Sequence, residues 1–262
     1  MFLAIDIGNS LIKFGIFESS ALIDKFSIPT ERDYSPDELL FGRLHKNGSR
    51  FLTYDAVAVS SVVPELDETF RKALTASFNV IPCFIDHSYD FGLKIKYKPA
   101  SAAGIDRLIN ASAAAEKYGV PVIACSFGTA TTFDVVNANT EYPGGAIAPG
   151  LRVLSHALHL KTAKLPEINI TEPEKVIGST TESSISSGIF FGYIGMVEGI
   201  LTRMFAELSL RPKVIATGGL AATVAGKCSL IGIVDENLTL DGIRKITERT
   251  DRNRPTKRTG ER

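Results

Sequence analysis

The sequence predicts an α/β protein built from two related halves. Short apolar segments typical of β-strands alternate along the chain with longer segments of helical periodicity. The first two strands follow each other closely enough to form a hairpin before that alternation begins. A shift of 120 residues places Ala4–Ser10 on Ala124–Ala130, so a strand that ends in a glycine turn occurs twice. With 262 residues, 44% of them hydrophobic, the chain is long enough to bury a substantial core.

The expected elements follow from local composition and period. Apolar and β-branched runs bounded by polar turn residues predict strands at 2–7, 11–17, 56–60, 80–85, 120–125, 131–136 and 214–216. Helical periodicity predicts helices at 64–77, 105–118, 151–158, 183–208 and 240–250. The glycine-rich stretch 142–150 is open to two interpretations, a backbone-rich turn or a mere connection before the helix at 151. The glycine element in 214–221 follows a strand and precedes a helical stretch, where a ribose or adenine can lie on the backbone.

Charge and cysteine usage narrow the functional class. The formal net charge is zero, but residues 244–262 hold eight Lys or Arg and three acids, which gives them +5. We interpret this segment as a solvated tail and expect no nucleic-acid partner. Cys83, Cys125 and Cys228 are far apart and are expected to be reduced. The N-terminus lacks signal-peptide character, and the longest apolar region, Ile185–Val197, is too short to span a membrane, so a cytoplasmic soluble protein without a membrane partner is expected.

Two hairpin turns carry the polar residues expected of a phosphate site. Glycine lets a polyanion approach the backbone N–H groups of such a turn, and nearby hydroxyl, amide and ammonium groups add donors. These residues are Gly8, Asn9, Ser10 and Lys13 in the first hairpin, and Thr129, Thr131 and Thr132 in the second. One such hairpin is more often an ordinary turn, whereas two at matching offsets favour a phosphate chain. Asp6 would repel phosphates unless a hard cation such as Mg²⁺ lies between them.

A candidate acceptor site lies in Gly104–Arg107, before an alanine-rich helix. Asp106 is open to two interpretations, a helix-capping acid or an aspartate that accepts the proton of an alcohol. Arg107 is correspondingly either its surface partner or a group that holds a carboxylate or phosphoryl charge.

Together the motifs resemble a known family. They are AIDIGNSLIKFGIF, YKPASAAGIDRLINA, FGTATTFDVV, GGAIAPG, AKLPEI, SSGIFFGYIGMVEGI, ATGGLA and LTLDGIR, in this order from residue 2 to about residue 246. The set is similar to the type III pantothenate kinases, within the acetate and sugar kinase, heat-shock chaperone and actin superfamily. The resemblance covers nearly the whole chain.

The resemblance implies a fold of two duplicated ribonuclease H-like, actin-like ATPase domains with a cleft between them. Residues 1–115 would hold the phosphate and substrate loops, residues 116–250 the second phosphate loop and adenosine motif, and residues 251–262 a basic tail. The implied activity is ATP-dependent phosphorylation of pantothenate to 4′-phosphopantothenate, the first step of coenzyme A biosynthesis. A homodimer, Mg²⁺ and a monovalent cation, K⁺ or NH₄⁺, are implied with it.

The resemblance also assigns roles by motif position. Asp106 matches the catalytic base, and Asp6 matches the residue that binds Mg²⁺ with ATP, directly or through water. The ATP-binding positions are Asp6, Ile7, Gly8, Asn9, Ser10, Leu11, Ile12, Lys13 and Thr129. The substrate-binding positions are Tyr97, Gly104, Ile105, Asp106, Arg107 and Thr181.

Ser126 departs from the family, which has an aspartate there that helps bind the monovalent cation. A hydroxyl can ligate a cation but lacks the charge attraction. Three consequences stay open: no K⁺ requirement, compensation by another carboxylate such as Asp134, or low activity. The alternative function is therefore a weak or inactive paralogue that binds nucleotide or pantothenate as a regulator.

A further pattern concerns the helix expected at 183–208. Its glycines Gly188, Gly192, Gly195 and Gly199 lie on one helical face, which indicates close approach by another backbone. Internal packing and a dimer contact are both consistent with this face.

Overall fold

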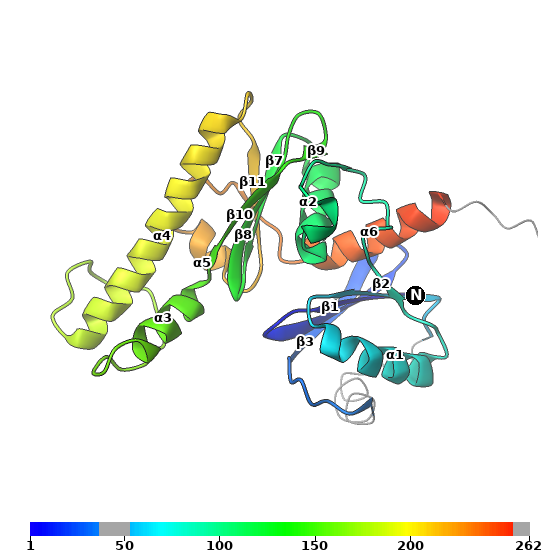
Figure 1. The fold of residues 1–262 in the computed structure, drawn as a ribbon, viewed down its shortest axis with the longest axis horizontal. Helices are drawn as coiled ribbons and strands as arrows, with labels where there is room; N and C mark the ends of the chain where they lie inside the picture. Colours follow the sequence, from blue (N-terminus) through cyan, green and yellow to red (C-terminus); the bar gives the residue numbers. More distant parts are fainter. Residues whose placement is uncertain (37–52, 254–262) are drawn as a thin grey trace, which may run out of the picture. The chain divides into compact units, whose positions relative to one another are not determined.

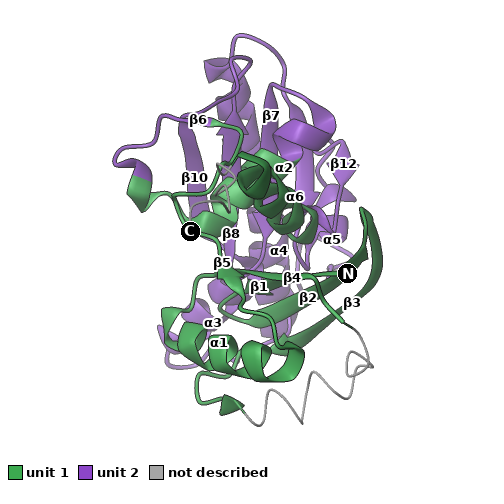
Figure 2. Ribbon diagram, turned by 90° about the vertical axis from the view of Figure 1, so that its right-hand side faces the viewer, with its two compact units in different colours: residues 1–93, 101–113, 239–262 green, residues 94–100, 114–238 purple. Residues whose placement is uncertain are grey.

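The structure, a computed structural model, describes residues 1–36 and 53–253. The chain divides into two compact units, coloured in Figure 2. Unit 1 comprises residues 1–93, 101–113 and 239–262, and unit 2 comprises residues 94–100 and 114–238. The single domain boundary expected near residue 115 stays a prediction, and the units group the chain differently, since the last helix belongs with the first strands. The basic tail lies almost wholly outside the described residues.

Unit 1 contains a five-stranded mixed sheet (Figure 1). In spatial order its strands are β3 (Ala21–Pro29), β2 (Leu11–Glu18), β1 (Phe2–Ile7), β4 (Ala56–Ser61) and β5 (Cys83–Phe84). β1 pairs antiparallel with β2 and parallel with β4, and β4 pairs parallel with β5. Since side chains alternate along a strand, Ile5 and Ile7 share one face of β1, and Ala4 and Asp6 share the other.

The first of these faces forms the core of unit 1 with α1 (Pro64–Phe78). Leu66, Phe70 and Leu74 on α1 are buried in one apolar cluster with Ile5 and Ile7. Proline suits the first turn of this helix because the N–H that it lacks has no partner within the helix. This packing leaves the opposite face of the sheet, with Asp6, available to other elements.

That opposite face is covered by the last helix of the chain. α2 (Ile105–Tyr118) and α6 (Leu238–Asn253) approach each other closely, because a Cβ at Gly242 would lie only 2.7 Å from Ile109 Cγ2. The Thr239 hydroxyl donates a hydrogen bond of 2.8 Å to Asn110 Oδ1. A Cβ at Gly15 on β2 would lie 3.0 Å from Leu240 Cδ1, which places α6 against the sheet face of Asp6. These contacts explain why α6 groups with unit 1.

Unit 2 repeats the same sheet. In spatial order its strands are β10 (Gly144–Pro149), β8 (Ala130–Val136), β7 (Val122–Phe127), β11 (Lys213–Thr217) and β12 (Ile233–Val234). A separate pair joins β6 (Lys94–Ile95) and β9 (Glu141–Tyr142) in parallel. The helices are α3 (Leu151–Leu160), α4 (Thr181–Glu207) and α5 (Ala221–Ala225). Phe127 and Phe133 form an apolar core with Phe190, Val197 and Leu201 of α4.

The order and direction of the strands confirm the expected duplication. β7 pairs antiparallel with β8 and parallel with β11, and β11 pairs parallel with β12. β3, β2, β1, β4 and β5 therefore correspond one by one to β10, β8, β7, β11 and β12. The two units are two copies of one mixed sheet.

Two expectations about the strands were wrong. Residues 142–150 do not form a turn, because Gly144–Pro149 is the strand β10, paired along its whole length with β8. The strand expected at 80–85 is reduced to Cys83–Phe84. β3 was not anticipated, since three of its nine residues, Asp24, Lys25 and Ser27, are polar and weaken the apolar signal.

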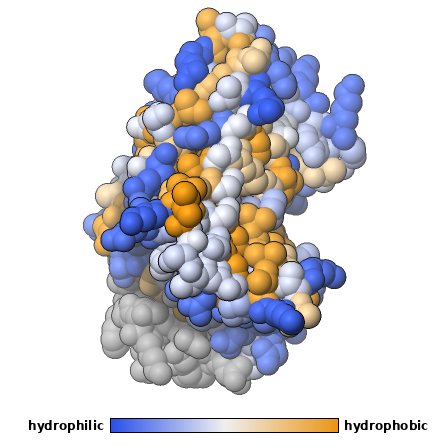
Figure 3. All heavy atoms as spheres, turned by 90° about the vertical axis from the view of Figure 1, so that its left-hand side faces the viewer, coloured by the Kyte–Doolittle hydropathy of each residue, from blue (hydrophilic) through white to orange (hydrophobic). Residues whose placement is uncertain are grey.

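The long helix α4 confirms the helix expected at 183–208, but it is apolar over more residues than the stretch Ile185–Val197 judged too short to span a membrane. It has 27 residues, and an 18-residue window with mean hydropathy 1.4 makes it long and apolar enough to cross a membrane by length and composition alone. One such helix is weak evidence, and α4 instead packs Phe190, Val197 and Leu201 into the core of unit 2. The side of the protein that carries α4 shows apolar and polar residues intermixed (Figure 3).

Candidate active site

The turn between β1 and β2 has the geometry expected of a phosphate-binding hairpin. The Gly8 N–H donates to the Leu11 carbonyl at 3.1 Å, which closes the turn. Asn9, Ser10 and Leu11 at its tip are exposed. A Cβ on Gly8 would lie 3.0 Å from the Leu11 carbonyl oxygen, so the turn favours glycine at this position. The tip therefore presents backbone and polar groups to solvent.

Thr30, which follows β3, holds this turn in place. Its hydroxyl donates to the Gly8 carbonyl at 2.7 Å, and its N–H donates to the Ser10 carbonyl at 3.1 Å. Thr30 could not be found from the sequence, because nothing local to residue 30 indicates contact with a turn 22 residues earlier. The hairpin is thus fixed from a neighbouring strand end.

Asp6 lies at the base of the hairpin, on the sheet face opposite the α1 core. Lys13, its cross-strand partner, approaches Asp6 Oδ2 to 3.4 Å. Burial raises the pKa of Asp6, and the charge and hydrogen bond of Lys13 oppose that rise. Ser60 on β4 is the other register partner of Asp6 and is fully buried. A carboxylate, an ammonium and a hydroxyl thus occupy three adjacent strands.

Asp106 stands in the first turn of α2, in the same unit. A Cβ on Gly104 would lie 2.7 Å from Asp106 Oδ1, so the carboxylate folds back over the Gly104 Cα. Burial and then the negative charge of Asp6 raise the pKa of Asp106, while the backbone N–H and charge of Arg107 lower it. Arg107 is buried, which excludes its interpretation as a surface partner. Asp6 and Asp106 are therefore close enough to interact electrostatically.

The second hairpin, between β7 and β8, has a similar construction in unit 2. The Gly128 N–H donates to the Ala130 carbonyl at 3.1 Å, and Gly128, Thr129 and Ala130 are exposed at the tip. The Gly150 N–H donates to the Thr129 carbonyl at 3.0 Å, as Thr30 does in the first hairpin. A Cβ on Gly150 would lie 2.2 Å from the Gly128 carbonyl oxygen, so this position requires glycine.

Ser126 is the counterpart of Asp6 in unit 2, and its register partners are Thr132 and Thr217. Asp134, the carboxylate considered as a substitute for the missing aspartate, is fully buried. It accepts hydrogen bonds of 2.9 Å from the Tyr142 hydroxyl and the Thr132 hydroxyl. Asp134 is thus engaged within the sheet of unit 2.

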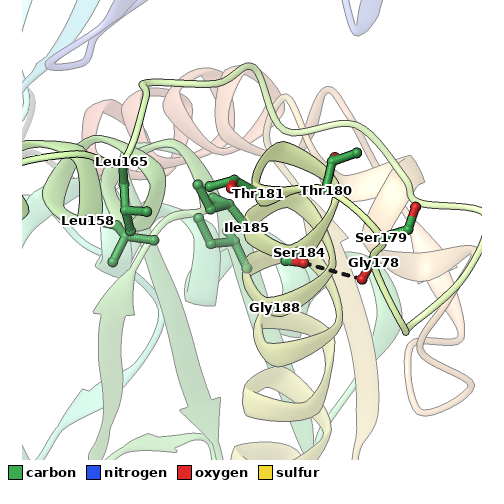
Figure 4. A pocket seen from close by; sticks show the side chains of 10 residues that line it. Leu158, Leu165, Gly178, Ser179, Thr180, Thr181, Ser184, Ile185 and Gly188 are labelled. Carbon is green, nitrogen blue, oxygen red and sulfur yellow. Dashed lines mark hydrogen bonds between the residues drawn. The ribbon is translucent and has the colours of Figure 1, made fainter.

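The remaining candidate residues lie elsewhere in unit 2. Tyr97 packs against Gly144 at the start of β10, whereas Thr129 contacts Gly150 just beyond the end of β10. A six-residue strand spans about 17 Å, so these two residues lie at opposite ends of β10. Thr181, the first residue of α4, lines a pocket of about 720 Å³ together with Leu158, Leu165 and Ile185 (Figure 4).

The structure therefore brings Asp6, Lys13 and Asp106 together in unit 1. Thr129, Tyr97 and Thr181 occupy three different places within unit 2. Among the described residues no group of three or more His, Cys, Asp or Glu forms a self-sufficient metal site. The chemistry available in unit 1 is that of two carboxylates beside a polar, exposed turn.

Solved structures with the same arrangement define the class of protein. A conserved protein from Campylobacter jejuni, assigned to the Baf family of transcriptional activators, matches with TM-score 0.61 and 20% identity over 95% of this chain and 99% of that chain. A ROK family glucokinase from Streptomyces griseus, solved with glucose and AMPPNP, matches with TM-score 0.51 and 12% identity over 94% and 99%. The duplicated sheets thus form the actin-like ATPase fold of the sugar kinases, as expected.

Sequence comparison identifies the family within this class. The model of the type III pantothenate kinase family matches residues 2–203. Type III pantothenate kinase of Koribacter versatilis is 40% identical over 266 residues, which cover 97% of each chain, and that of Brevibacillus brevis is 42% identical over 95% of this chain and 99% of its own. The chain belongs to the type III pantothenate kinase family and is a kinase.

Proposed function

We propose that this protein transfers the γ-phosphoryl group of ATP to the primary hydroxyl of pantothenate, which yields 4′-phosphopantothenate and ADP. This is the first step of coenzyme A biosynthesis. The observation that carries the proposal is membership of the kinase family along nearly the entire chain, with similar coverage of the relatives. The pairing of Asp6 with Asp106 in unit 1 supports it chemically.

In this mechanism Asp106 is the catalytic base. The hydroxyl oxygen of pantothenate attacks the γ-phosphorus, the bond to the bridging oxygen of ADP breaks, and the Asp106 carboxylate accepts the hydroxyl proton. Burial and the nearby charge of Asp6 raise the pKa of Asp106, which makes its carboxylate a stronger base. Arg107 holds negative charge of the substrate or of the transferring group. Gly104 and Ile105 complete the substrate loop.

ATP is bound chiefly by the first hairpin. The backbone N–H groups of the exposed tip residues Asn9, Ser10 and Leu11 and the ammonium of Lys13 would face the phosphates, Gly8 closes the turn, and Thr129 supplies a further contact. Ile7 and Ile12 are buried and hold the two strands together below the turn. Tyr97 and Thr181 contribute to the pantothenate pocket.

Mg²⁺ fits the donor set of unit 1. This ion retains waters and binds through one or two carboxylates together with substrate phosphates, so it needs no cage of three protein ligands. Asp6 would hold it, directly or through water, and the ion would neutralise charge on the phosphates. The residues expected to bind the monovalent cation do not fit such an ion equally well. Ser126 lacks a charge, and the Asp134 carboxylate already accepts two hydrogen bonds. We infer that turnover does not require K⁺ or NH₄⁺.

A homodimer formed through α4 agrees with the glycine face of that helix. Gly188, Gly192 and Gly195 are exposed, and a Cβ on any of them would meet no atom within 4 Å. Internal packing within the described chain therefore does not explain these glycines. A second copy that packs its backbone here would, and Gly192→Leu is expected to convert the dimer to a monomer in sedimentation analysis. Gly192→Ala, the smaller change, is the matched variant.

The cellular setting follows from the function. The family consists of metabolic enzymes, and α4 packs into a core, so the protein is soluble. We propose the cytoplasm, where ATP and pantothenate meet, as its location.

The deciding experiment measures phosphopantothenate from purified protein, ATP, Mg²⁺ and pantothenate, with K⁺ present or replaced by a bulky organic cation. Equal product in both conditions supports the kinase and its independence of K⁺. Product only with K⁺ refutes that independence but retains the kinase. Absence of product from folded, ligand-binding protein would instead favour the inactive paralogue.

A further inference from the structure

The loop after β5, residues 86–92, makes hydrogen bonds both to the end of α6 and to the segment that precedes Asp106. All of these parts belong to unit 1. The His87 Nε2–H donates a hydrogen bond of 2.9 Å to the Ala103 carbonyl, the last residue before Gly104. The acceptor is a carbonyl, so the bond fixes Nε2 as the donor. We refer to residues 86–92 as the bracket loop.

The far end of the bracket loop is anchored firmly. The Asn253 amide donates to Asp90 Oδ2 at 2.8 Å, and the Thr250 hydroxyl accepts from the Asp90 N–H at 3.0 Å. Arg249 donates to the Asp90 carbonyl at 3.1 Å. Three residues at the C-terminal end of α6 thus form hydrogen bonds with Asp90 of the bracket loop.

Hydrogen bonds also fix Phe91 and the first residues of the bracket loop, 86–88. The Ser112 hydroxyl of α2 donates to the Phe91 carbonyl at 2.5 Å. Asp86 accepts from the N–H and the hydroxyl of Ser88 at 2.8 and 2.6 Å, which orders the turn that carries His87. The backbone that carries His87 is therefore held in place, although the His87 side chain is exposed.

The hydrogen bond from His87 to Ala103 can influence the position of the proposed catalytic base, Asp106, because only Gly104 and Ile105 separate Ala103 from Asp106. Ala103 is buried, and the Gly104 carbonyl accepts the first hydrogen bond of α2 from the Leu108 N–H at 3.0 Å. The Asp106 carboxylate lies against the Gly104 Cα. A displacement of the Ala103–Gly104 peptide therefore moves the surface on which that carboxylate rests.

We propose that His87 is a positioning residue, and that the bracket loop holds the substrate loop so that Asp106 faces the acceptor hydroxyl. His87 reaches the reaction only through Ala103 and Gly104. The catalytic part of this proposal rests on the proposed function, whereas the ordering of residues 100–106 does not. Reactions that depend on orientation are sensitive to small displacements of the reacting group.

The test compares His87→Ala with His87→Gln, whose amide N–H can replace the imidazole donor. His156→Ala is the matched control, because His156 also makes one side-chain hydrogen bond, of 3.0 Å to the exposed Glu167 in unit 2. Steady-state kinetics give kcat and the KM values of pantothenate and ATP, thermal unfolding reports stability, and amide hydrogen exchange reports the order of residues 100–106 without any substrate.

For His87→Ala we expect exchange of residues 100–106 to accelerate and kcat/KM for pantothenate to fall about 5-fold. The KM of ATP and the unfolding temperature should stay unchanged, and His87→Gln should recover most of the loss. Asp90→Ala, at the anchored end, should produce the same signature, and combining it with His87→Ala should add little further loss.

Unchanged exchange in His87→Ala overturns the proposal whatever the activity. Equal loss in every kinetic parameter, in step with lower thermal stability, also overturns it, because that pattern indicates a general structural role. Accelerated exchange in a protein whose wild type makes no phosphopantothenate supports the positioning of the loop and refutes the proposed function instead.

Discussion

Replacing Asp106 by asparagine separates the catalytic from the electrostatic role of this carboxylate. Asparagine keeps the shape of the side chain and one acceptor oxygen, but it cannot take the proton of an alcohol. We expect kcat to fall about 100-fold or more, since general base catalysis commonly contributes that much. The KM of ATP should change little, because the phosphates are bound by the first hairpin.

The same substitution should stabilise the folded protein at neutral pH. Burial and the charge of Asp6 raise the folded pKa of Asp106, so the folded state binds this proton more tightly than the unfolded chain does. The stability of the wild type relative to Asp106→Asn is therefore highest below the unfolded pKa of about 3.9 and declines as pH rises through the folded value. Urea unfolding should therefore show a gain in stability for the asparagine variant at pH 7.5 that shrinks as pH falls towards 4.

The assay pairs ADP release in the presence of pantothenate with urea unfolding at pH 7.5 and near pH 4. Asp86→Asn serves as the control of opposite sign, because hydrogen bonds from Ser88 lower the pKa of Asp86. That variant should lose stability at pH 7.5. Near-normal turnover in Asp106→Asn would refute the base assignment, and a loss of stability at neutral pH would refute the electrostatic argument.

Three further predictions concern unit 2. Tyr142→Phe removes the hydroxyl that donates to the buried Asp134, and urea unfolding should show a loss of about 2 kcal/mol; an unchanged midpoint would contradict this. In Gly150→Ala the new Cβ would overlap backbone oxygens at 2.2 and 2.5 Å, so the second hairpin should distort and the KM of ATP should rise, whereas an unaltered KM would exclude Thr129 as an ATP contact. Burial raises the pKa of Asp235, but hydrogen bonds from Lys117 and Tyr118 outweigh it, so the folded pKa is lowered. Stability from this pair is present above about pH 3.9 and is lost as pH falls through the folded value. Lys117→Met should therefore destabilise at pH 7 by about 1 kcal/mol and far less near pH 3, and an equal loss at both would argue against the ion pair.

Local features of the site were predictable because they depend on residues that are neighbours in sequence. The turn at Gly8 needs only a glycine between two apolar strands, and Asp106 beside Gly104 follows from a helix start. The contacts that fix these features are not local. His87 and Ala103 are 16 residues apart, and Asp90 and Asn253 are 163 apart. Such pairs leave no periodic signal, since each partner is an ordinary loop or helix-end residue until the fold places them together.

The misjudged strand β10 has a different cause. Its glycines and proline are typical of turns, yet each has a structural reason in an edge strand. A Cβ on Gly145 would lie 1.7 Å from the Phe133 carbonyl oxygen, so the close strand approach needs glycine. Pro149 stands at the strand end, opposite Ala130, at the edge of the sheet, where the missing N–H is tolerated.

The duplication shows how far a fixed offset can be trusted. Ser126 corresponds to Asp6 at an offset of 120, and both have hydroxyl-bearing partners on the parallel strand, Thr217 and Ser60. On the antiparallel strand, however, Asp6 faces Lys13 while Ser126 faces Thr132. The second hairpin is therefore one residue shorter, and since side chains alternate, the residue 120 positions after Lys13 points to the opposite face, into the core. After the turn, an offset of 120 residues therefore matches residues that point to the site face of β2 with residues that point to the core face of β8. Only the strand pairing identifies Thr132 as the counterpart of Lys13. The ammonium and both carboxylates of the proposed active site belong to unit 1, and in unit 2 the hydroxyls of Ser126 and Thr132 occupy the places of Asp6 and Lys13.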